Sequence, residues 1–300
     1  MLVRVVASGL NPLDAKIRAG QAAHARQEAP AILGIDMAGI VEAVGDGVTS
    51  FAEGDAVYGM TGGVGGIPGS LAEFVAVDAR LLARAPLRLP LADGAAIPLG
   101  FITAWEGLVD RAALREGQSL LVHGGAGGVG SMAVQLGVAR GARVVATGSA
   151  GQEEAIAAMG AVFVDYRDTP IETIVATHTG GAGFDVVYDT LGGATLDASF
   201  KAVRRYGGHV VSSLGWGTHS LAPLSFRAGT YSGVFTLLPL LSGEGREHHG
   251  AIMAEATRLA DAGRLRPVLS SRRFDLADGN AALDLVESGR AGGKVIVTVG

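Results

Sequence analysis

The feature that most constrains the fold of this chain is an apolar run that breaks into glycines at residues 120–130, which read LLVHGGAGGVG. Gly125, Gly127 and Gly130 have the spacing Gly-x-Gly-x-x-Gly where a helix is expected to begin. In a strand–turn–helix unit the first glycine permits a tight turn. The second lets the backbone approach a pyrophosphate, and the third allows the helix to pack closely on the strand. The pyrophosphate then binds free N–H groups at the positive end of the helix.

The flanking sequence agrees with this interpretation. Residues 119–123 are typical of a buried strand, apolar residues recur at helical spacing from Val129 to Leu136, and Gly141 ends the pattern. A second apolar run at residues 143–147 completes a strand–helix–strand unit. Because the chain holds 47 glycines, chance matches are expected, and the context carries the prediction of a dinucleotide site. The alternative is a glycine-rich structural turn that binds nothing.

The pattern along the chain predicts two domains. Short β-rich runs separated by Gly, Pro and Asp-Gly in the first hundred residues indicate a barrel-like, mainly antiparallel domain. After Ala95, strand and helix patterns alternate, with a helix expected at residues 103–114, which is typical of a doubly wound parallel sheet. Two further helices and a closing strand are expected to return to the first domain. We therefore predict an α/β protein with a catalytic domain, residues 1–95 and 237–300, and an inserted Rossmann domain, residues 96–236.

Composition excludes several classes of function. The net charge of −5 argues against a nucleic-acid surface, which needs a concentrated basic patch. The absence of cysteine excludes disulfides, catalytic thiols and cysteine-ligated zinc. The seven histidines form no metal-binding pattern, and the adjacent His248 and His249 are expected at the surface. Without a basic leader or a run of about 18 apolar residues, we expect a soluble, cytoplasmic protein with no membrane partner.

The end of the second Rossmann strand chooses between the two nicotinamide cofactors. An acidic residue there binds the ribose 2′-hydroxyl of NAD and repels the 2′-phosphate of NADP. Here the strand continues into Gly148, Ser149 and two small residues, with no acid before Glu153. The sequence therefore favours NADP(H), although it shows no basic partner for the phosphate nearby.

Further motifs occur in a fixed order along almost the whole chain. They are GLNPLDAKIRAG (9–20), GIDMAGIVEAVGDGV (34–48), GDAVYG (54–59), GSLAEFVAV (69–77), IPLGFITAW (97–105), VDYRD (164–168), FDVVYDTLGG (184–193) and GKVIV (293–297). With the glycine-rich segment, they resemble the zinc-independent quinone oxidoreductases, the zeta-crystallin-like branch of the medium-chain dehydrogenase/reductases. The resemblance implies a GroES-like catalytic domain, a cofactor whose nicotinamide lies near loop 11–16, and a homodimer joined near residues 230–238.

The resemblance also implies which residues contact the cofactor. They form a pyrophosphate loop, a 2′-phosphate region, a turn near the ribose or nicotinamide, and a frame around the carboxamide. In that order they are Gly125, Ala126, Gly127, Gly128, Val129 and Gly130; Gly148, Ser149 and Tyr166; Gly192 and Gly193; and Ser213, Leu214, Gly215, Val234, Phe235 and Thr236, with Thr103 as a further contact.

On the substrate side the resemblance implies Asn11, Asp14 and Lys16 as catalytic residues. Zinc-dependent relatives carry cysteine at the position of Asn11 and Gly-His-Glu at residues 34–36, so a metal-free site is expected. Lys16 replaces a tyrosine of many relatives and is one of three lysines in the chain, and a lysine can give up a proton more readily than arginine. The alternatives are that Lys16 is solvated or pairs with Asp14, and that Asp14 is only a turn residue. Lys294 is a weaker candidate for the same region.

Two departures from the family bear on the prediction. Lys16 substitutes an ammonium for a phenol, and the chain begins later than its relatives, without the usual first hairpin. We expect either a truncated start or a smaller barrel with one exposed sheet edge.

Together these observations predict an NADPH-dependent enzyme that transfers hydride to a small-molecule electrophile, a quinone or an α,β-unsaturated carbonyl. One alternative is an enoyl-thioester reductase, for which Arg18, Arg26, Arg227 or Arg246 would supply a basic entrance. Another is a protein that binds NADPH with little turnover.

Overall fold

The computed structural model describes residues 1–300 and divides them into two compact units. Met1–Ile102 and Thr236–Gly300 form the first unit, and Thr103–Phe235 form the second. The first boundary lies between Ile102 and Thr103, within helix α3 (Pro98–Trp105), whereas the sequence pattern predicted it after residue 95.

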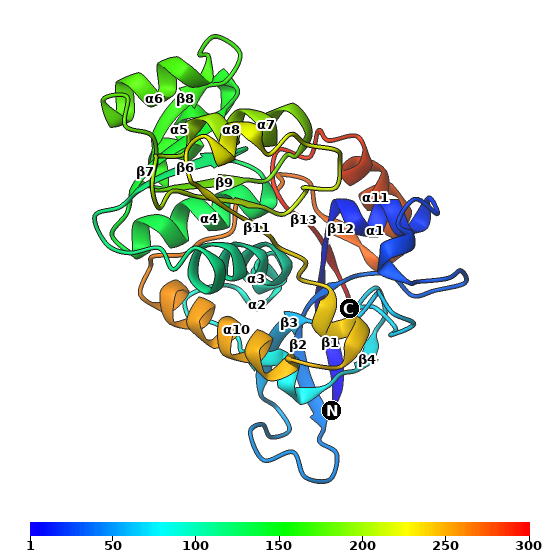
Figure 1. The fold of residues 1–300 in the computed structure, drawn as a ribbon. Helices are drawn as coiled ribbons and strands as arrows, with labels where there is room; N and C mark the ends of the chain where they lie inside the picture. Colours follow the sequence, from blue (N-terminus) through cyan, green and yellow to red (C-terminus); the bar gives the residue numbers. More distant parts are fainter. The chain divides into compact units, whose positions relative to one another are not determined.

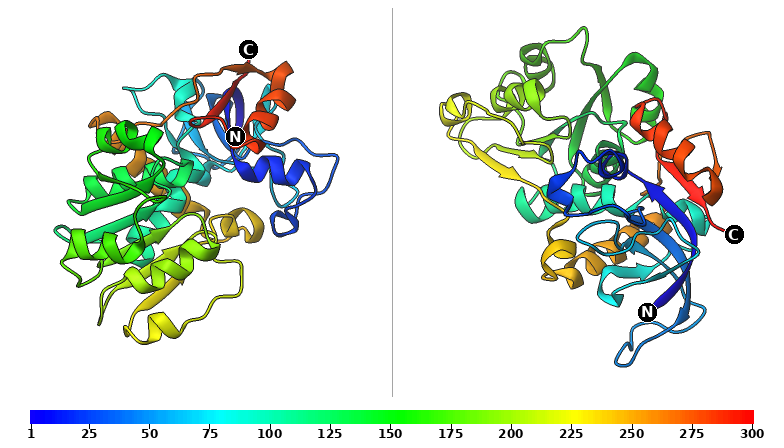
Figure 2. Two further views of the ribbon diagram at one scale, coloured as in Figure 1. Left: turned by 90° about the horizontal axis from the view of Figure 1, so that it is seen from above. Right: turned by 90° about the vertical axis from the view of Figure 1, so that its right-hand side faces the viewer.

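The first unit is built on a seven-stranded sheet in which both ends of the chain meet. Strand β1 (Leu2–Leu10) pairs antiparallel with β2 (Asp36–Ala43) and with β13 (Val295–Thr298). These first and last strands lie side by side as the blue and red arrows of Figures 1 and 2. The tail of the chain therefore completes the first unit, as the sequence predicted.

The remaining strands extend this sheet in both directions. Beyond β2 lie β3 (Ala56–Met60) and β5 (Leu82–Arg84), both antiparallel to their neighbours. Strand β12 (Phe274–Asp275) is parallel to β13, and β4 (Phe74–Ala76) pairs with the start of β1. One apolar cluster, which includes Val3, Met37 and Val57, packs against this sheet.

Five further helices belong to the first unit. They are α1 (Pro12–Arg18), α2 (Leu91–Gly94), α9 (Leu238–Ser242), α10 (Arg246–Asp261) and α11 (Gly279–Glu287), with short turns of 3₁₀ helix at Ala23–Ala25, Ala79–Leu81 and Leu276–Asp278. The expectation that His248 and His249 both lie at the surface was wrong. His249 is fully buried on α10, because adjacent helical residues point about 100° apart and one of the two faces the core.

The second unit is a six-stranded parallel sheet in the order β11-β10-β9-β6-β7-β8. Its strands are β6 (Ser119–His123), β7 (Arg143–Gly148), β8 (Val162–Asp165), β9 (Val186–Asp189), β10 (His209–Ser212) and β11 (Thr230–Gly233). The chain order reverses between the central strands β6 and β9, which pair with each other. In open parallel sheets this reversal point is where ligands bind. Every residue of β6 is buried, which explains why the sequence predicted its bounds.

Helices cover both faces of this sheet. Helix α4 (Gly128–Ala139) lies on one side, and α6 (Ile171–Thr179), α7 (Gly193–Ala202) and α8 (Ala222–Ser225) lie on the other (Figure 1). The short segments Ala150–Gln152 and Glu153–Ala158, the latter α5, connect β7 to β8. Phe184, Leu196 and Phe200 are buried in the cluster that packs α7 against the sheet.

The helix expected at residues 103–114 differs in the structure. Helix α3 begins earlier, at Pro98, and the chain then widens into a π-helical turn at Glu106–Arg111. Gly107 lies in this turn, and a Cβ added to it would be 2.1 Å from Cε2 of the buried Tyr188. The ring and the turn are held together because the Tyr188 hydroxyl donates to the carbonyl of Thr103 at 2.7 Å. Apolar spacing alone does not reveal such a contact.

The predicted fold class is confirmed. A mainly antiparallel unit comes from both ends of the chain, and a doubly wound parallel sheet is inserted between them. None of the helices combines the length and apolar character needed to cross a bilayer.

Candidate active site

The expected cofactor contacts of the second unit gather at the carboxyl ends of its parallel strands. Gly125–Gly130 follow β6, Gly148 and Ser149 end β7, Tyr166 follows β8, Gly192 and Gly193 follow β9, Ser213–Gly215 follow β10, and Val234 and Phe235 follow β11. Since all these strands are parallel, the residues share one edge of the sheet. Thr103 and Thr236 lie at the two points where the chain passes between units, and both are buried.

The pyrophosphate loop, residues 124–130, has the geometry that its spacing predicts. Gly127 precedes α4, a helix of 12 residues whose first-turn N–H groups have no acceptor within the helix. A Cβ on Gly130 would lie 2.0 Å from the carbonyl oxygen of Gly124, so this glycine is required by the packing of the loop itself. A Cβ on Gly128 would meet nothing within 4 Å. The loop is therefore tightly packed at Gly130 and open at Gly128, where helix α4 begins. This arrangement fits a dinucleotide pyrophosphate.

The region expected to hold the 2′-phosphate contains a cation that the sequence search missed. The N–H of Tyr166 donates to the carbonyl of Gly148 at 3.2 Å, which places the tyrosine beside the end of β7. Tyr166 is 57% exposed, and the guanidinium of Arg167 lies 5.8 Å from the centre of its ring. Its place next to Tyr166 in the sequence could have indicated Arg167, which lies after β8 rather than in the segment after β7.

In the first unit, a buried ion pair includes Asp36 and contacts Asn11. These two residues lie where zinc-dependent relatives carry the Gly-His-Glu segment and the cysteine. The amide nitrogen of Asn11 donates to Oδ2 of Asp36 at 3.0 Å, and Lys294 Nζ donates to the same oxygen at 2.8 Å. Lys294 also donates to Oδ1 of Asn11. The Asp36 and Lys294 side chains are 0% and 9% exposed. Lys294, a weak candidate from the sequence, is therefore in direct contact with Asn11.

Asp14 supports the start of α1 from inside the unit. Its carboxylate accepts the N–H of Asn11 at 2.8 Å and the N–H of Gly34 at 3.1 Å, and the residue is fully buried. Burial raises the pKa of Asp14 to about 6, with the charge of Asp36 adding to the shift and that of Lys294 opposing it.

Lys16 lies on α1 and is the one exposed member of the expected catalytic set. It forms no salt bridge with Asp14, because Asp14 is directed into the unit. Its charge contributes to the lowered pKa of His24, for which burial is the larger cause.

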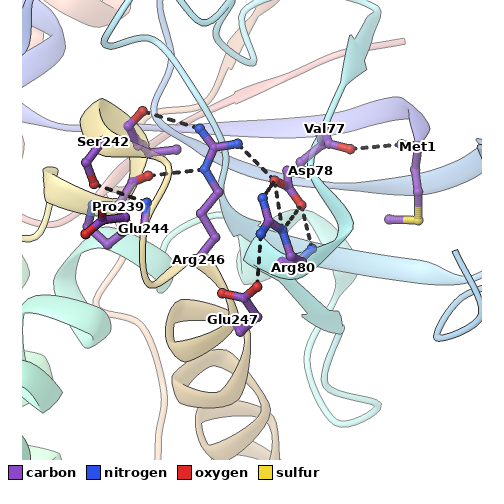
Figure 3. A network of polar contacts seen from close by, with 10 residues as sticks. Met1, Val77, Asp78, Arg80, Pro239, Ser242, Glu244, Arg246 and Glu247 are labelled. Atoms are coloured by element: carbon purple, nitrogen blue, oxygen red, sulfur yellow. Dashed lines mark hydrogen bonds and ion pairs between the residues drawn. The ribbon is translucent and has the colours of Figure 1, made fainter. Parts of the chain in front are cut away.

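Three of the four arginines considered for a basic entrance are held by protein groups. Arg246 donates to Asp78 at 2.9 Å and to the carbonyl of Pro239 at 3.1 Å, within the network of Figure 3. Arg18 donates to two carboxylates of α11, and Arg227 donates to a backbone carbonyl. Arg26 alone is exposed with its side chain in no ion pair or hydrogen bond.

Comparison with known proteins places this geometry in a family. Residues 1–87 match the alcohol dehydrogenase GroES-like domain, and residues 159–297 match the zinc-binding dehydrogenase family. The 2-methylene-furan-3-one reductase of Solanum lycopersicum is 34% identical over 305 residues, covering 99% of this chain and 71% of that protein. This chain belongs to the medium-chain dehydrogenase/reductase superfamily.

Within the superfamily, the relatives include oxidoreductases of alkenals and quinones, polyketide synthases and an enoyl reductase. The chloroplastic NADPH-dependent alkenal/one oxidoreductase of Arabidopsis thaliana is 33% identical, over 99% of this chain and 71% of the relative. An alcohol dehydrogenase superfamily protein from Novosphingobium aromaticivorans has a TM-score of 0.97 and 55% identity, over 100% of this chain and 91% of that one. The CurK enoyl reductase has a TM-score of 0.85 and 25% identity, over 100% and 90%.

Proposed function

We propose that this medium-chain reductase transfers hydride from NADPH to a quinone or an α,β-unsaturated carbonyl without a metal ion. The observation that carries the proposal is the buried contact among Asn11, Asp36 and Lys294. Catalytic zinc in proteins needs three protein ligands and an open position. Here the carboxylate of Asp36 is bound by Lys294, by Asn11 and by the N–H of Leu99, and the preceding residue, Ile35, is a buried apolar side chain.

The exposed side chain of Lys16 supports the reduction of a substrate whose oxygen is conjugated, such as a quinone or an enone. When bound, NADPH supplies a hydride from C4 of its nicotinamide. Negative charge then develops on the oxygen of the acceptor, where a hydrogen-bond donor lowers the barrier. Lys16 is the donor that we propose. The polar atoms of Asn11 and Asp14 form hydrogen bonds with other groups of the protein. These bonds hold the start of α1, the helix that carries Lys16.

The proposed preference for NADPH over NADH rests on residues at the carboxyl ends of strands β7 and β8 in the second unit. Strand β7 ends at Gly148 with no acidic residue, and Ser149 follows it. Arg167, stacked on Tyr166, supplies a positive charge for a phosphate. The pyrophosphate would bind the first-turn N–H groups of α4.

An enoyl-thioester reductase is the second candidate, supported by the likeness to CurK enoyl reductase. A carrier with phosphate groups would need free basic residues at its entrance. We rank this candidate lower because only Arg26 of the four arginines is free, whereas Arg18, Arg227 and Arg246 are bound by other groups of the protein.

Substitution of Lys16 tests the proposal. A residue that stabilises or protonates the developing oxyanion contributes about a hundredfold or more to turnover. We therefore expect Lys16→Met to lower kcat for quinone or enone by about this factor, with the Kd of NADPH unchanged. Lys201→Met, which removes an exposed lysine of α7, is the control. Equal kcat for Lys16→Met and the wild type would exclude Lys16 as the donor.

A further inference from the structure

Asp189 is a buried carboxylate at the carboxyl end of β9 for which the proposed chemistry has no use. It is 0% exposed, and its carboxylate accepts four hydrogen bonds from three protein donors. The N–H of Leu191 donates to Oδ1 at 3.2 Å, and the N–H of Gly192 donates to both oxygens, at 3.1 and 3.0 Å. The third donor is the hydroxyl of Ser212, 2.7 Å from Oδ2. A carboxylate with this many donors fixes the turn that follows β9.

Through Ser212 the same carboxylate also fixes the loop after the neighbouring strand. Ser212 ends β10 and is 1% exposed. Its hydroxyl accepts the N–H of Leu214 at 3.1 Å while it donates to Asp189. The N–H of Ser213 donates to the backbone carbonyl of Asp189 at 3.2 Å. One side chain therefore organises both loop 190–193 and loop 213–215.

The two loops pack against each other so closely that no side chain fits between them at Gly192. Gly192 has a φ of +72°, and a Cβ added to it would lie 2.4 Å from the carbonyl oxygen of Leu214. The backbone of one loop thus contacts the backbone of the other, and their relative position depends on the bonds to Asp189 and Ser212. The pyrophosphate loop and the end of β7 receive no bond from the Asp189 carboxylate.

We propose that Asp189 is a positioning residue for the nicotinamide half of NADPH, acting through Ser212 on the two loops together. This inference rests on the proposed function, which puts loops 190–193 and 213–215 around the nicotinamide. The adenosine half would be held by α4, Ser149, Tyr166 and Arg167, which Asp189 does not contact. Loss of the carboxylate should therefore weaken binding of the whole cofactor and spare binding of its adenosine half.

The test uses isothermal titration calorimetry to compare the binding of two ligands to variants of two aspartates, one at the end of β9 and one just before its start. The ligands are NADPH and 2′,5′-ADP, which lacks the nicotinamide half. The variants are Asp189→Asn and, as the matched control, Asp185→Asn, at the residue that immediately precedes β9. Asp185 is also buried, and it accepts the N–H and hydroxyl of Ser119 at 2.8 Å and Arg204 at 2.5 Å.

For Asp189→Asn we expect the Kd of NADPH to rise about tenfold and that of 2′,5′-ADP to stay within about twofold, from the loss of one charged hydrogen-bond set. For Asp185→Asn we expect both constants to stay within about twofold of the wild type. Ser212→Ala removes only the bridge between the loops. It should raise the Kd of NADPH in the same direction by a smaller factor, and it serves if Asp189→Asn does not fold.

The outcomes separate the two proposals. If the wild type binds NADPH and 2′,5′-ADP but neither Asp189→Asn nor Ser212→Ala alters the ratio of the two constants, the role of Asp189 is wrong and the cofactor proposal stands. The same conclusion follows if Asp185→Asn changes the ratio equally. If the wild type binds neither ligand, both proposals are overturned.

Discussion

At the scale of single residues, two glycines of the pyrophosphate loop are expected to have different roles, one in folding and the other in cofactor binding. The Cβ of an alanine at position 130 would meet a backbone oxygen, whereas at position 128 it would enter open space. The two positions are two residues apart in the sequence and belong to the same helix.

We expect Gly130→Ala to destabilise the protein, because its Cβ would force the loop to shift. Overpacking of this kind costs about 1–3 kcal/mol of unfolding free energy. Gly128→Ala should leave the unfolding free energy within about 0.5 kcal/mol, since a surface change without contacts is nearly neutral, and should weaken NADPH binding. Thermal unfolding without cofactor and NADPH titration measure the two effects. Equal stability of the two variants would contradict the geometry of the loop.

Asp14 gives the unfolding free energy a dependence on pH. Burial raises its pKa from 3.8 to about 6, so the folded state holds its proton more tightly than the unfolded state does. The contribution of this group is present below about pH 4 and is lost as the pH rises through 6, about 3 kcal/mol in all.

Asp14→Asn mimics the protonated acid and does not titrate. Its unfolding free energy relative to the wild type should therefore increase by about 3 kcal/mol between about pH 4 and pH 7. Urea denaturation at a series of pH values measures this difference. A difference that does not change with pH would show that Asp14 titrates normally in the folded protein.

At the scale of elements, the ion pair of Asp36 and Lys294 joins the start of β2 to the segment just before β13. Both side chains are almost fully buried, so the stability of each charge depends on the other. Removing one partner of such a pair costs about 3–5 kcal/mol, because the remaining charge is buried alone.

Lys294→Met should therefore lower the unfolding free energy by about 3–5 kcal/mol. The double variant Asp36→Asn, Lys294→Met should recover part of this loss, since no unpaired charge remains. Chemical denaturation measures both, with the exposed Lys201→Met as control. If Lys294→Met unfolds at the same denaturant concentration as Lys201→Met, the buried pair does not stabilise the unit.

Contacts between elements show which features could be predicted from the sequence and which could not. Strand β6 was predicted with its bounds because five successive buried residues leave a local pattern. The partners Asp36 and Lys294 are 258 residues apart, so no periodicity connects them. The bonds of Asp189 depend on a neighbouring strand in the same way, and the π-helical turn depends on the ring of Tyr188. Motif spacing predicted which edge of the sheet binds the cofactor, but it did not predict the polar side chains that hold the loops of this edge.

At the scale of the whole molecule, β11 forms one edge of the six-stranded sheet, with Thr230 and Gly233 exposed. We propose that two copies pair along this edge to form a homodimer. Of the residues 230–238 near which the dimer contact was expected, Thr230–Gly233 form β11, and helix α9 begins at Leu238. A native mass in solution equal to that of one chain, 30.3 kDa, would contradict the dimer.

The most direct test of metal-free, NADPH-dependent reduction is the rate of NADPH oxidation with phenanthrenequinone, a 2-alkenal or crotonyl-CoA, with NADH in parallel and with or without a chelator. Metal-free, NADPH-dependent reduction predicts turnover of the quinone or the alkenal that prefers NADPH and is unchanged by the chelator. Faster turnover of crotonyl-CoA would favour the enoyl-thioester reductase. Loss of activity with the chelator, preference for NADH, or NADPH binding without oxidation in the presence of any of the three acceptors would contradict it.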